Sequence, residues 1–501
     1  MHLCNRHHPH ASRRTFLSLA SGTALACGCM TLAGCAANPA TGEQGLLGLS
    51  SVTDDVRLGS SQYPELIKAF GGAYNQDRVQ NYVTAIGRRV AATTELPDLP
   101  YEFTVLNSPI INALALPGGK IAITRGLLAL ASSEAEVAGV LAHEAGHVNA
   151  RHGAQGQNRA LLANVGLAIL GIATGSSELM QLGQTVAQGF LQGYSRDQEF
   201  EADTLGVRYL ARAGYDPAAM PAFLASMREQ SQVEAQMHGL PPGEVDKFNI
   251  MASHPRTVER VQQANAAAQA SVVPNPVVGR AAYLEAINGL MFADDPEQGL
   301  VRGRRFIHPV LRITFTAPAG FLLRNSTENV TAQHRDGAAI VFDAAPVQRA
   351  RNLREYLQYE WAGDTPLSQV EDITVNGLAA ATGVVRLNGQ SGPVDVRLVA
   401  YAVERDQVYR FTFITPANFS RALSTGLRET TYSFRRIDET EAAAVKPLRV
   451  VIAPVNAGDT VASLARSLPY EGFNEAWFRL LNDLQPGQEL TLGQSVKIVV
   501  S

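Results

Sequence analysis

Apolar residues recur at helical spacing early in the chain. Between residues 53 and 92 they fall three or four positions apart with polar residues between them, as at Val79, Val83, Ile86 and Val90. This period predicts amphipathic helices that cover a more buried layer. The stretch from residue 127 to residue 152 keeps the same spacing without a proline, which predicts one continuous helix there.

Two short apolar runs lie between these helical stretches. They cover residues 101–106 and 121–124, and Pro117, Gly118 and Gly119 form a turn signal before the second run. Runs of this length beside a turn predict a small sheet. The first half of the chain is therefore expected to be mainly helical with a few strands.

A different pattern governs the second half. From residue 313 to residue 437 alternating and β-branched runs dominate around one helical stretch, which predicts a separate α+β domain. The last residues read as strand, helix, helix and strand. The expected division is a leader at 1–35, a tether at 36–52, a helical domain at 53–265, a linker at 266–304, an α+β domain at 305–440 and a small βααβ module at 446–501.

Composition narrows the class of protein. The chain has 501 residues, 46% hydrophobic and 18% charged, which is enough for two or three globular domains. Its formal net charge is -4, and an acidic body argues against nucleic acid as a partner. All four cysteines lie within the first 35 residues, so the rest of the chain has no disulfide framework.

The first 35 residues resemble a bacterial export signal. Arg13 and Arg14 precede a run of small and apolar residues and resemble the twin-arginine type of signal. Leu32-Ala33-Gly34-Cys35 closes the run and resembles a lipobox. Cys35 is therefore expected to be the acylated first residue of a mature lipoprotein, anchored in the outer membrane and facing the periplasm. A Sec signal that is cut nearby without lipidation is the alternative.

A metal-binding motif lies on the later turns of the predicted helix. His143-Glu144-Ala145-Gly146-His147 places two imidazoles at positions i and i+4, on one side of a helix. Such a pair suits tetrahedral zinc, and Glu144 stands where it can take a proton from a water on the metal. One zinc ion per chain is therefore expected.

The third protein ligand must come from another segment, because the chain has Ala150 and Gly153 where a metzincin needs glycine and histidine. About fifty residues later, Glu199 and Asp203 stand at i and i+4 of a second helical segment and share a face. We expect Glu199 to bind the metal and Asp203 to support a ligating imidazole. Glu201, on another face of that helix, is the alternative ligand.

These features resemble the HtpX/BepA/CAAX-prenyl-protease family of gluzincin zinc peptidases. The resemblance covers roughly residues 50 to 265 and rests on HEAGH, on Glu199-Phe200-Glu201-Ala202-Asp203, on the stretch from Asn112 to Gly119, and on Ser253-His254-Pro255. It implies a mainly helical metalloprotease domain with a small sheet. It also implies that the first acid of the ExxxD pattern, Glu199, is the third zinc ligand.

The same resemblance suggests how a substrate is held. The stretch that contains Asn112, Pro117, Gly118 and Gly119 would border the substrate cleft. The strand at 120–124 would accept a substrate backbone as an added strand, which tolerates many side chains; an ordinary sheet edge is the alternative. His254 would either approach the zinc as a removable ligand or donate a hydrogen bond to the tetrahedral oxyanion, with a plain surface histidine as the alternative.

The C-terminal residues resemble a LysM module in three phrases, which are 455–465, Leu480-Leu481-Asn482 and 492–498. LysM modules bind glycans that contain N-acetylglucosamine, so the resemblance implies contact with peptidoglycan. The alternative is a unit that packs against the protease domain or binds protein.

Together these expectations describe a zinc-dependent endopeptidase of the bacterial cell envelope that hydrolyses misfolded or unassembled envelope proteins, with polypeptides as partners and no nucleic acid. One alternative is a non-enzymatic chaperone or peptidoglycan-binding lipoprotein with a latent zinc site. Another is a metallopeptidase that cleaves peptidoglycan cross-links. The intact Glu144 argues against a complete loss of catalysis in the first alternative. The hypothesis of peptidoglycan cross-link cleavage rests on the C-terminal module alone.

Overall fold

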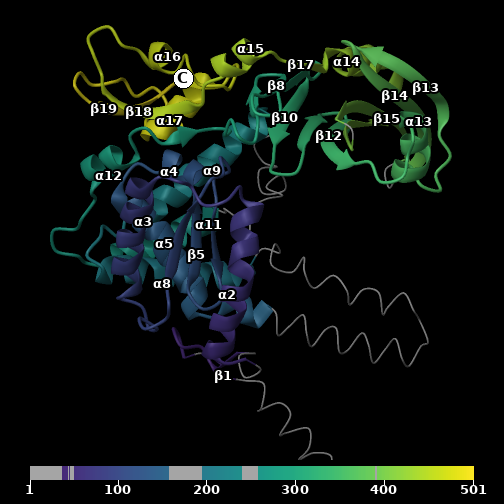
Figure 1. The fold of residues 1–501 in the computed structure, drawn as a ribbon. Helices are drawn as coiled ribbons and strands as arrows, with labels where there is room; N and C mark the ends of the chain where they lie inside the picture. The colour runs from purple at the N-terminus through teal and green to yellow at the C-terminus, as the bar shows by residue number, and fades with distance from the viewer. Residues whose placement is uncertain are drawn as a thin grey trace, which may run out of the picture.

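The computed structural model describes residues 36–42, 44–45, 50–156, 194–237, 239, 258–389, 392–404 and 406–501. The expected leader with Cys35, and His254, lie outside these residues. The described chain is α+β, with a helical N-terminal unit, a middle unit built on a large sheet and a small C-terminal module (Figure 1). No described helix combines the length and the apolar composition that crossing a bilayer requires.

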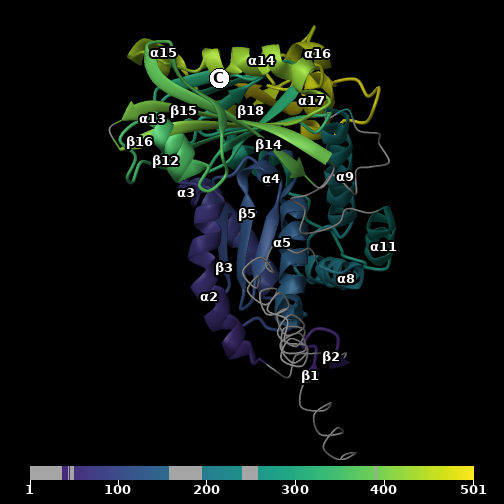
Figure 2. The same cartoon turned by 90° about the vertical axis from the view of Figure 1, so that its right-hand side faces the viewer.

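The N-terminal unit surrounds a small sheet with helices. Its helices are α2 (Val52–Ala69), α3 (Asp77–Ala91), α4 (Arg125–Leu130), α5 (Glu134–Asn149), α8 (Arg196–Arg212), α9 (Ala219–Met237), α11 (Val258–Gln269) and α12 (Arg280–Ile287). Its strands are β3 (Glu102–Leu106), β4 (Ala113–Leu116) and β5 (Lys120–Thr124), preceded by the short pair β1 (Ala36–Ala37) and β2 (Gln44–Gly45). Figure 2 shows α2 on one side of the sheet and α5 on the other, with α8 and α11 beyond α5.

Local sequence explains where the helices of this unit begin. Ser51 and Asp54 form a capping box at the start of α2, and Ser195 and Gln198 form another at the start of α8. The apolar stripe of α3 is buried as its spacing predicted. These caps fix the entry points of the helices, and the buried stripes fix which faces turn inward.

The continuous helix predicted for residues 127–152 is wrong. The chain forms α4, leaves helical conformation at Ala131, and starts α5 after Ser133. The reason is capping. The hydroxyl of Ser133 accepts a hydrogen bond from the backbone N–H of Glu136, which has no partner within the first turn of the new helix. Apolar spacing alone does not reveal such a break.

The strand expected to receive a substrate is also placed differently. In the three-stranded sheet the order is β3-β5-β4, so β5 pairs with β3 in parallel and with β4 antiparallel. Residues 120–124 therefore have both edges occupied and cannot take an added strand. Within the described residues, β4 is the outer strand on the side of α5.

The middle unit is built on antiparallel sheets. A seven-stranded sheet has the order β10-β11-β12-β16-β15-β14-β13, with strands at Phe321–Asn325, Val330–His334, Ala339–Pro346, Gln407–Pro416, Gly392–Glu404, Leu378–Gly389 and Ser368–Val375. A smaller sheet joins β7 (Leu300–Arg302), β8 (Arg305–His308), β9 (Ile313–Thr316) and β17 (Arg435–Arg436). The helical elements are α13 (Leu353–Glu355), η3 (Tyr356–Trp361), α14 (Ser420–Ser433) and α15 (Glu439–Ala444). Separate apolar clusters contain Leu427 of α14 and Leu357 of η3, so the unit has its own core.

The C-terminal module shares its core with the N-terminal unit. It consists of β18 (Leu448–Pro454), α16 (Val461–Leu464), α17 (Asn474–Asn482) and β19 (Ser495–Val500), in the predicted order of strand, helix, helix and strand. Trp477 and Val499 belong to the same buried cluster as Val79 and Leu141. Figure 1 shows the module lying against α4 and α9.

The segment expected to be a linker, 266–304, is a structured part of this junction, which corrects that expectation. It contains α12 and a short strand, β6 (Met291–Phe292), which pairs with β18. The junction also contains a buried lysine, because the Nζ of Lys497 donates to the carbonyls of Ala129, Leu130 and Ala131 at 2.9, 3.0 and 2.7 Å. Lys497 thus satisfies the last carbonyls of α4, at the break before α5.

Candidate metal centre

Helix α5 presents two imidazoles to one side. His143 and His147 are both buried, and their Nε2 atoms lie 3.1 Å apart. Positions i and i+4 stand one above the other on a helix, which accounts for this approach. The two side chains therefore offer two nitrogen donors to a single point.

Helix α8 supplies a carboxylate to the same point. Glu199 is fully buried, with Oε2 3.7 Å from the Nε2 of His143 and Oε1 3.5 Å from the Nε2 of His147. Ligand atoms of a tetrahedral zinc with bonds of about 2.0–2.1 Å are separated by about 3.3 Å. The spacing and the two-histidine, one-carboxylate chemistry therefore fit zinc.

Two glycines allow α5 and α8 to approach closely. A Cβ on Gly146 would lie 3.0 Å from the backbone oxygen of Ala202, and one on Gly206 would lie 3.1 Å from the backbone nitrogen of His143. Larger residues at these positions would push the helices apart. The glycine within HEAGH thus has a packing reason, since it brings Glu199 within reach of the histidines.

His143 is held by a carboxylate and an arginine. Its Nδ1 lies 2.9 Å from the Oδ1 of Asp203, and Arg260 on α11 donates to both oxygens of Asp203 at 2.7 Å. Arg260 also contacts the Oε2 of Glu199 at 2.7 Å. Burial alone would raise the pKa of Asp203, but hydrogen bonds from Arg260 and His143 bring that pKa to about 2. Burial alone would lower the pKa of Arg260, but its contacts with Asp203 and Glu199 raise it.

His147 is held by a second chain of contacts. Its Nδ1 lies 2.8 Å from the Nδ1 of His152, and the Nε2 of His152 lies 3.1 Å from the Oε2 of Glu201. Burial would raise the pKa of Glu201, but hydrogen bonds, led by the one from His152, lower it. Glu201, the alternative ligand, therefore contacts His152, while Glu199 lies among the donors.

The ring of Tyr194 covers the other side of His147. The two rings stack with centroids 3.9 Å apart and planes 19° apart. Burial, together with the negative charges of Glu144 and Glu199, raises the pKa of the Tyr194 phenol, so it stays neutral. Tyr194 thus limits how the His147 imidazole can tilt.

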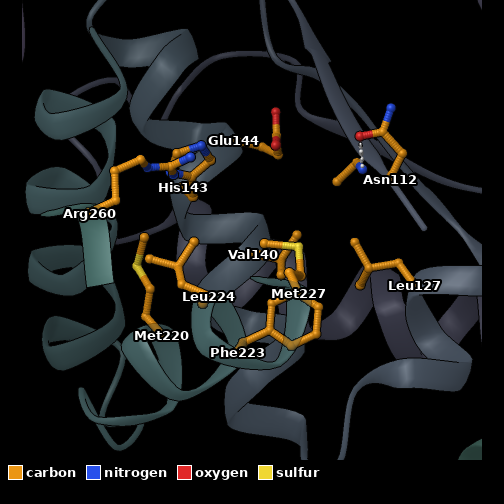
Figure 3. Close-up of a pocket in the computed structure, with 12 residues that line it drawn as sticks. Asn112, Leu127, Val140, His143, Glu144, Met220, Phe223, Leu224, Met227 and Arg260 are labelled. Carbon is orange, nitrogen blue, oxygen red and sulfur yellow. Dashed lines mark hydrogen bonds between the residues drawn. The ribbon is translucent and has the colours of Figure 1, made fainter. Parts of the chain in front are cut away.

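Glu144 lies on the wall of an apolar cavity beside the donors. The cavity is partly open to solvent and holds about 510 Å³ of space with the open part included. Figure 3 shows Glu144 between His143 and Asn112, with the apolar side chains below them. Apolar lining comes from α4, α5 and α9, through Leu127, Val140, Met220, Phe223, Leu224 and Met227. The arrangement places a carboxylate, the metal donors and an apolar chamber side by side.

Sequence comparison assigns this arrangement to a known family. Residues 77–268 match the family model Peptidase family M48. The matched residues run from α3 to α11 and include the zinc donors. This part of the chain is an M48 peptidase domain. Its match contains all three donors that the structure brings together, as the resemblance to gluzincin peptidases predicted.

Curated relatives share the M48 domain but only part of their length. The chain is 43% identical over 132 residues to the mitochondrial metalloendopeptidase OMA1 of Arabidopsis thaliana, covering 26% of each chain. It is 30% identical over 258 residues to the beta-barrel assembly-enhancing protease of Yersinia pestis, covering 49% of this chain and 50% of that protein. For the protein of the same name from Escherichia coli strain K12 the identity is 28% over 224 residues, covering 43% and 44%. The chain thus spans half or less of the length of these relatives.

The expected cleft residues of the M48 domain divide into two groups. Asn112 lines the apolar cavity, and Pro117 lines a second, smaller hollow together with His147. Gly118 and Gly119 have φ values of 77° and 88°, and a Cβ on Gly118 would lie 2.4 Å from the Cα of Val56 on α2. The two glycines therefore shape the turn between β4 and β5.

Sequence reasoning gave three residues near the metal donors no assigned role. Arg260 bridges Asp203 and Glu199 from the separate helix α11. His152 contacts the ligand His147 without being one of the three donors. Tyr194 gave no signal beyond its position before the capping box of α8.

Proposed function

We propose that this chain is a zinc-dependent endopeptidase. The observation that carries the proposal is the convergence of His143, His147 and Glu199, with Glu144 beside them on the wall of the cavity. Catalytic zinc sites use three protein ligands and leave one position for water or substrate. Asp203 would then orient the His143 imidazole through its Nδ1.

The protein residues would share the work of peptide hydrolysis. Zinc bound at the three donors would supply Lewis acidity, which activates a water and polarises a peptide carbonyl. The Glu144 carboxylate would accept the proton of the attacking water and later give it to the leaving amine. Arg260, 2.7 Å from the Oε2 of Glu199, would help to balance the charge that this carboxylate brings to the buried site.

The substrate would lie along β4. This strand is the outer strand of the small sheet, it packs against α5, and Ala113 lines the cavity next to Asn112. A substrate backbone that adds to β4 would place its carbonyls near Glu144 and allow one side chain to enter the cavity. Because the cavity is lined by methionine, leucine and phenylalanine side chains, we infer a preference for a bulky apolar residue next to the scissile bond.

We infer that the setting is the bacterial envelope and that the clients are misfolded or unassembled envelope proteins. Support comes from the signal-like residues before Cys35 and from the similarity to proteases named for beta-barrel assembly. An acyl group on Cys35 would lie only three residues from Asn38, which contacts Glu201. Three extended residues reach at most about 11 Å, so such an anchor would hold the active site near the membrane surface.

Peptidoglycan binding by the C-terminal module is a second candidate function. The order of strand, helix, helix and strand favours it, as does the resemblance of residues 446–501 to LysM modules. The shared core favours the alternative of a module that packs against the peptidase domain. Retention of the full chain on purified peptidoglycan would support glycan binding, and its absence would leave the packing role.

The decisive test compares the wild type with Glu144→Gln for zinc content and for cleavage of an unfolded protein. We expect one zinc per chain in both proteins, and cleavage that falls by about 10²–10⁴-fold in the variant, because general acid–base catalysis contributes about that factor. Glu65→Gln, an exposed position on α2, is the matched control and should cleave like the wild type.

Each other outcome has a definite meaning. Zinc in both proteins with cleavage by neither would contradict the peptidase and favour a non-enzymatic envelope protein with a latent site. Absence of zinc from the wild type would contradict the metal centre itself. Release of muropeptides in place of protein fragments would favour a peptidase of peptidoglycan cross-links.

A further inference from the structure

The chain of contacts behind His147 has a defined direction. The Nε2 of His147 faces the other donors, 3.1 Å from the Nε2 of His143 and 3.5 Å from the Oε1 of Glu199. A neutral imidazole that binds metal through Nε2 must carry its proton on Nδ1. That Nδ1–H therefore donates to the Nδ1 of His152, 2.8 Å away.

The tautomer of His152 follows from this contact. Since its Nδ1 accepts, its proton sits on Nε2, which donates to the Oε2 of Glu201 at 3.1 Å. His152 is almost fully buried, so water does not compete for these contacts. One arrangement of protons thus satisfies both imidazoles, and it ends on an ionised carboxylate.

The outer end of the chain is formed by residues from the start of the described sequence. The Nδ2 of Asn38 donates to the Oε1 of Glu201 at 2.5 Å, and the hydroxyl of Thr41 lies 3.2 Å from the same oxygen. Glu201 therefore receives hydrogen bonds on both oxygens, from His152 on Oε2 and from Asn38 and Thr41 on Oε1.

The segment 38–41 is itself docked on α8. Asn38 is buried, and its Oδ1 accepts from the backbone N–H of Ala40 at 2.9 Å. Ala40 belongs to the main apolar cluster, and its carbonyl accepts from Arg208 at 3.1 Å. These contacts fix the Asn38 amide without help from the metal.

We propose that residues 38–41, acting through Glu201 and His152, are a positioning element for the zinc ligand His147. This inference rests on the proposed zinc site, and it adds that the segment beside the expected lipid anchor sets how tightly the metal is held. The docked Asn38 fixes the Glu201 carboxylate, the carboxylate fixes the tautomer of His152, and His152 fixes the orientation of the His147 ring. Outer contacts of this kind commonly change metal affinity by about 10–100-fold.

The test measures zinc directly, using the full mature chain and a chromogenic chelator that competes for the metal. We expect Glu201→Gln to weaken zinc binding by about 10-fold, and Asn38→Ala to weaken it by about 3-fold, since Asn38 lies one contact further out than Glu201. Asp197→Asn removes a charge from an exposed position of the same helix, and Asn456→Ala removes an exposed asparagine far from the site. Both controls should bind zinc like the wild type.

Melting of the zinc-free proteins separates positioning from general stability. Weaker zinc binding with an unchanged melting temperature of the zinc-free variant would support the proposal. Zinc binding equal to that of the controls would overturn it, and so would a loss of zinc that merely follows a lower melting temperature of the zinc-free form. A wild type that binds zinc but cleaves no protein would contradict the peptidase while leaving the positioning element standing.

Discussion

Arg260 and Lys497 are both buried cations, and their pKa values are shifted in opposite directions. Arg260 contacts two buried carboxylates, Asp203 and Glu199, which raise its pKa. Lys497 contacts the three carbonyls of residues 129–131, and its burial lowers its pKa to about 7, although the nearby carboxylate of Glu136 opposes the shift. At Arg260 two carboxylates in direct contact outweigh the cost of burial, whereas at Lys497 burial outweighs the attraction of Glu136.

The two cations serve different parts of the molecule, Arg260 the metal site and Lys497 the junction with the C-terminal module. Arg260 compensates acids that the metal centre requires, so its charge is part of the electrostatics of zinc binding. Lys497 completes the end of α4 and joins the C-terminal module to the M48 domain. Substitutions at the two positions should therefore affect different properties.

The largest effect is expected for Arg260→Met in the zinc-free protein. Removing the guanidinium leaves two buried carboxylates without their partner, which should lower the free energy of unfolding by about 3–5 kcal/mol. Urea unfolding of the zinc-free form measures it. Arg354→Met is the control, since Arg354 pairs with Asp372 at the surface and should cost at most about 1 kcal/mol. Equal losses in the two variants would contradict the buried network.

Zinc affinity should distinguish the two cations next. Asp203→Asn removes the charge that holds the Nδ1 of His143 and should weaken zinc binding by about 10–100-fold in a chelator competition. Lys497→Met should leave zinc affinity unchanged, because Lys497 contacts the end of α4 and none of the donors. A loss of zinc in Lys497→Met as large as in Asp203→Asn would break the distinction.

The smallest effect is expected for the stability of Lys497→Met. Three carbonyls lose a donor, but a buried charge is also removed, so the free energy of unfolding at neutral pH should fall by only about 1 kcal/mol. The difference should depend on pH. With a folded pKa of about 7 and an ordinary value of 10.5, the unfolded wild type binds more protons between these values, so its stability rises with pH across that range.

Denaturant unfolding at a series of pH values from 6 to about 10 checks this sign. The advantage of the wild type over Lys497→Met should grow from pH 7 upward, by at most about 1.4 kcal/mol per pH unit. Below pH 7 the difference should be flat. A flat difference at all these pH values would mean that three carbonyl acceptors keep the ammonium form of Lys497 throughout.

Much of the candidate site could be predicted because its signals are local. His143 and His147 share a helix turn, and Glu199 and Asp203 share another, so fixed spacing along a helix was enough to single them out. Arg260 comes from a separate helix, and nothing in its own neighbourhood in the sequence indicates which acids it would meet. Contacts between distant segments depend on packing, which spacing does not encode.

The fold shows the same division. The helices of the M48 domain and the sheet-rich second half could be predicted from their periods. The central place of β5 could not, because a run of alternating residues does not reveal which strands lie beside it. The break between α4 and α5 depends on Ser133, and Lys497 gave only the weak signal of one lysine within an apolar strand.

The shared apolar core also determines when the peptidase domain can complete its folding during synthesis. Val79 and Val499 belong to one cluster, although the whole middle unit lies between them in the chain. A ribosome makes α5 long before it makes β19, so the core around α5 stays unfinished until β19 has been made. The core of the peptidase domain is thus completed only after the whole middle unit has been made, and a chain cut short before β19 would leave that core incomplete.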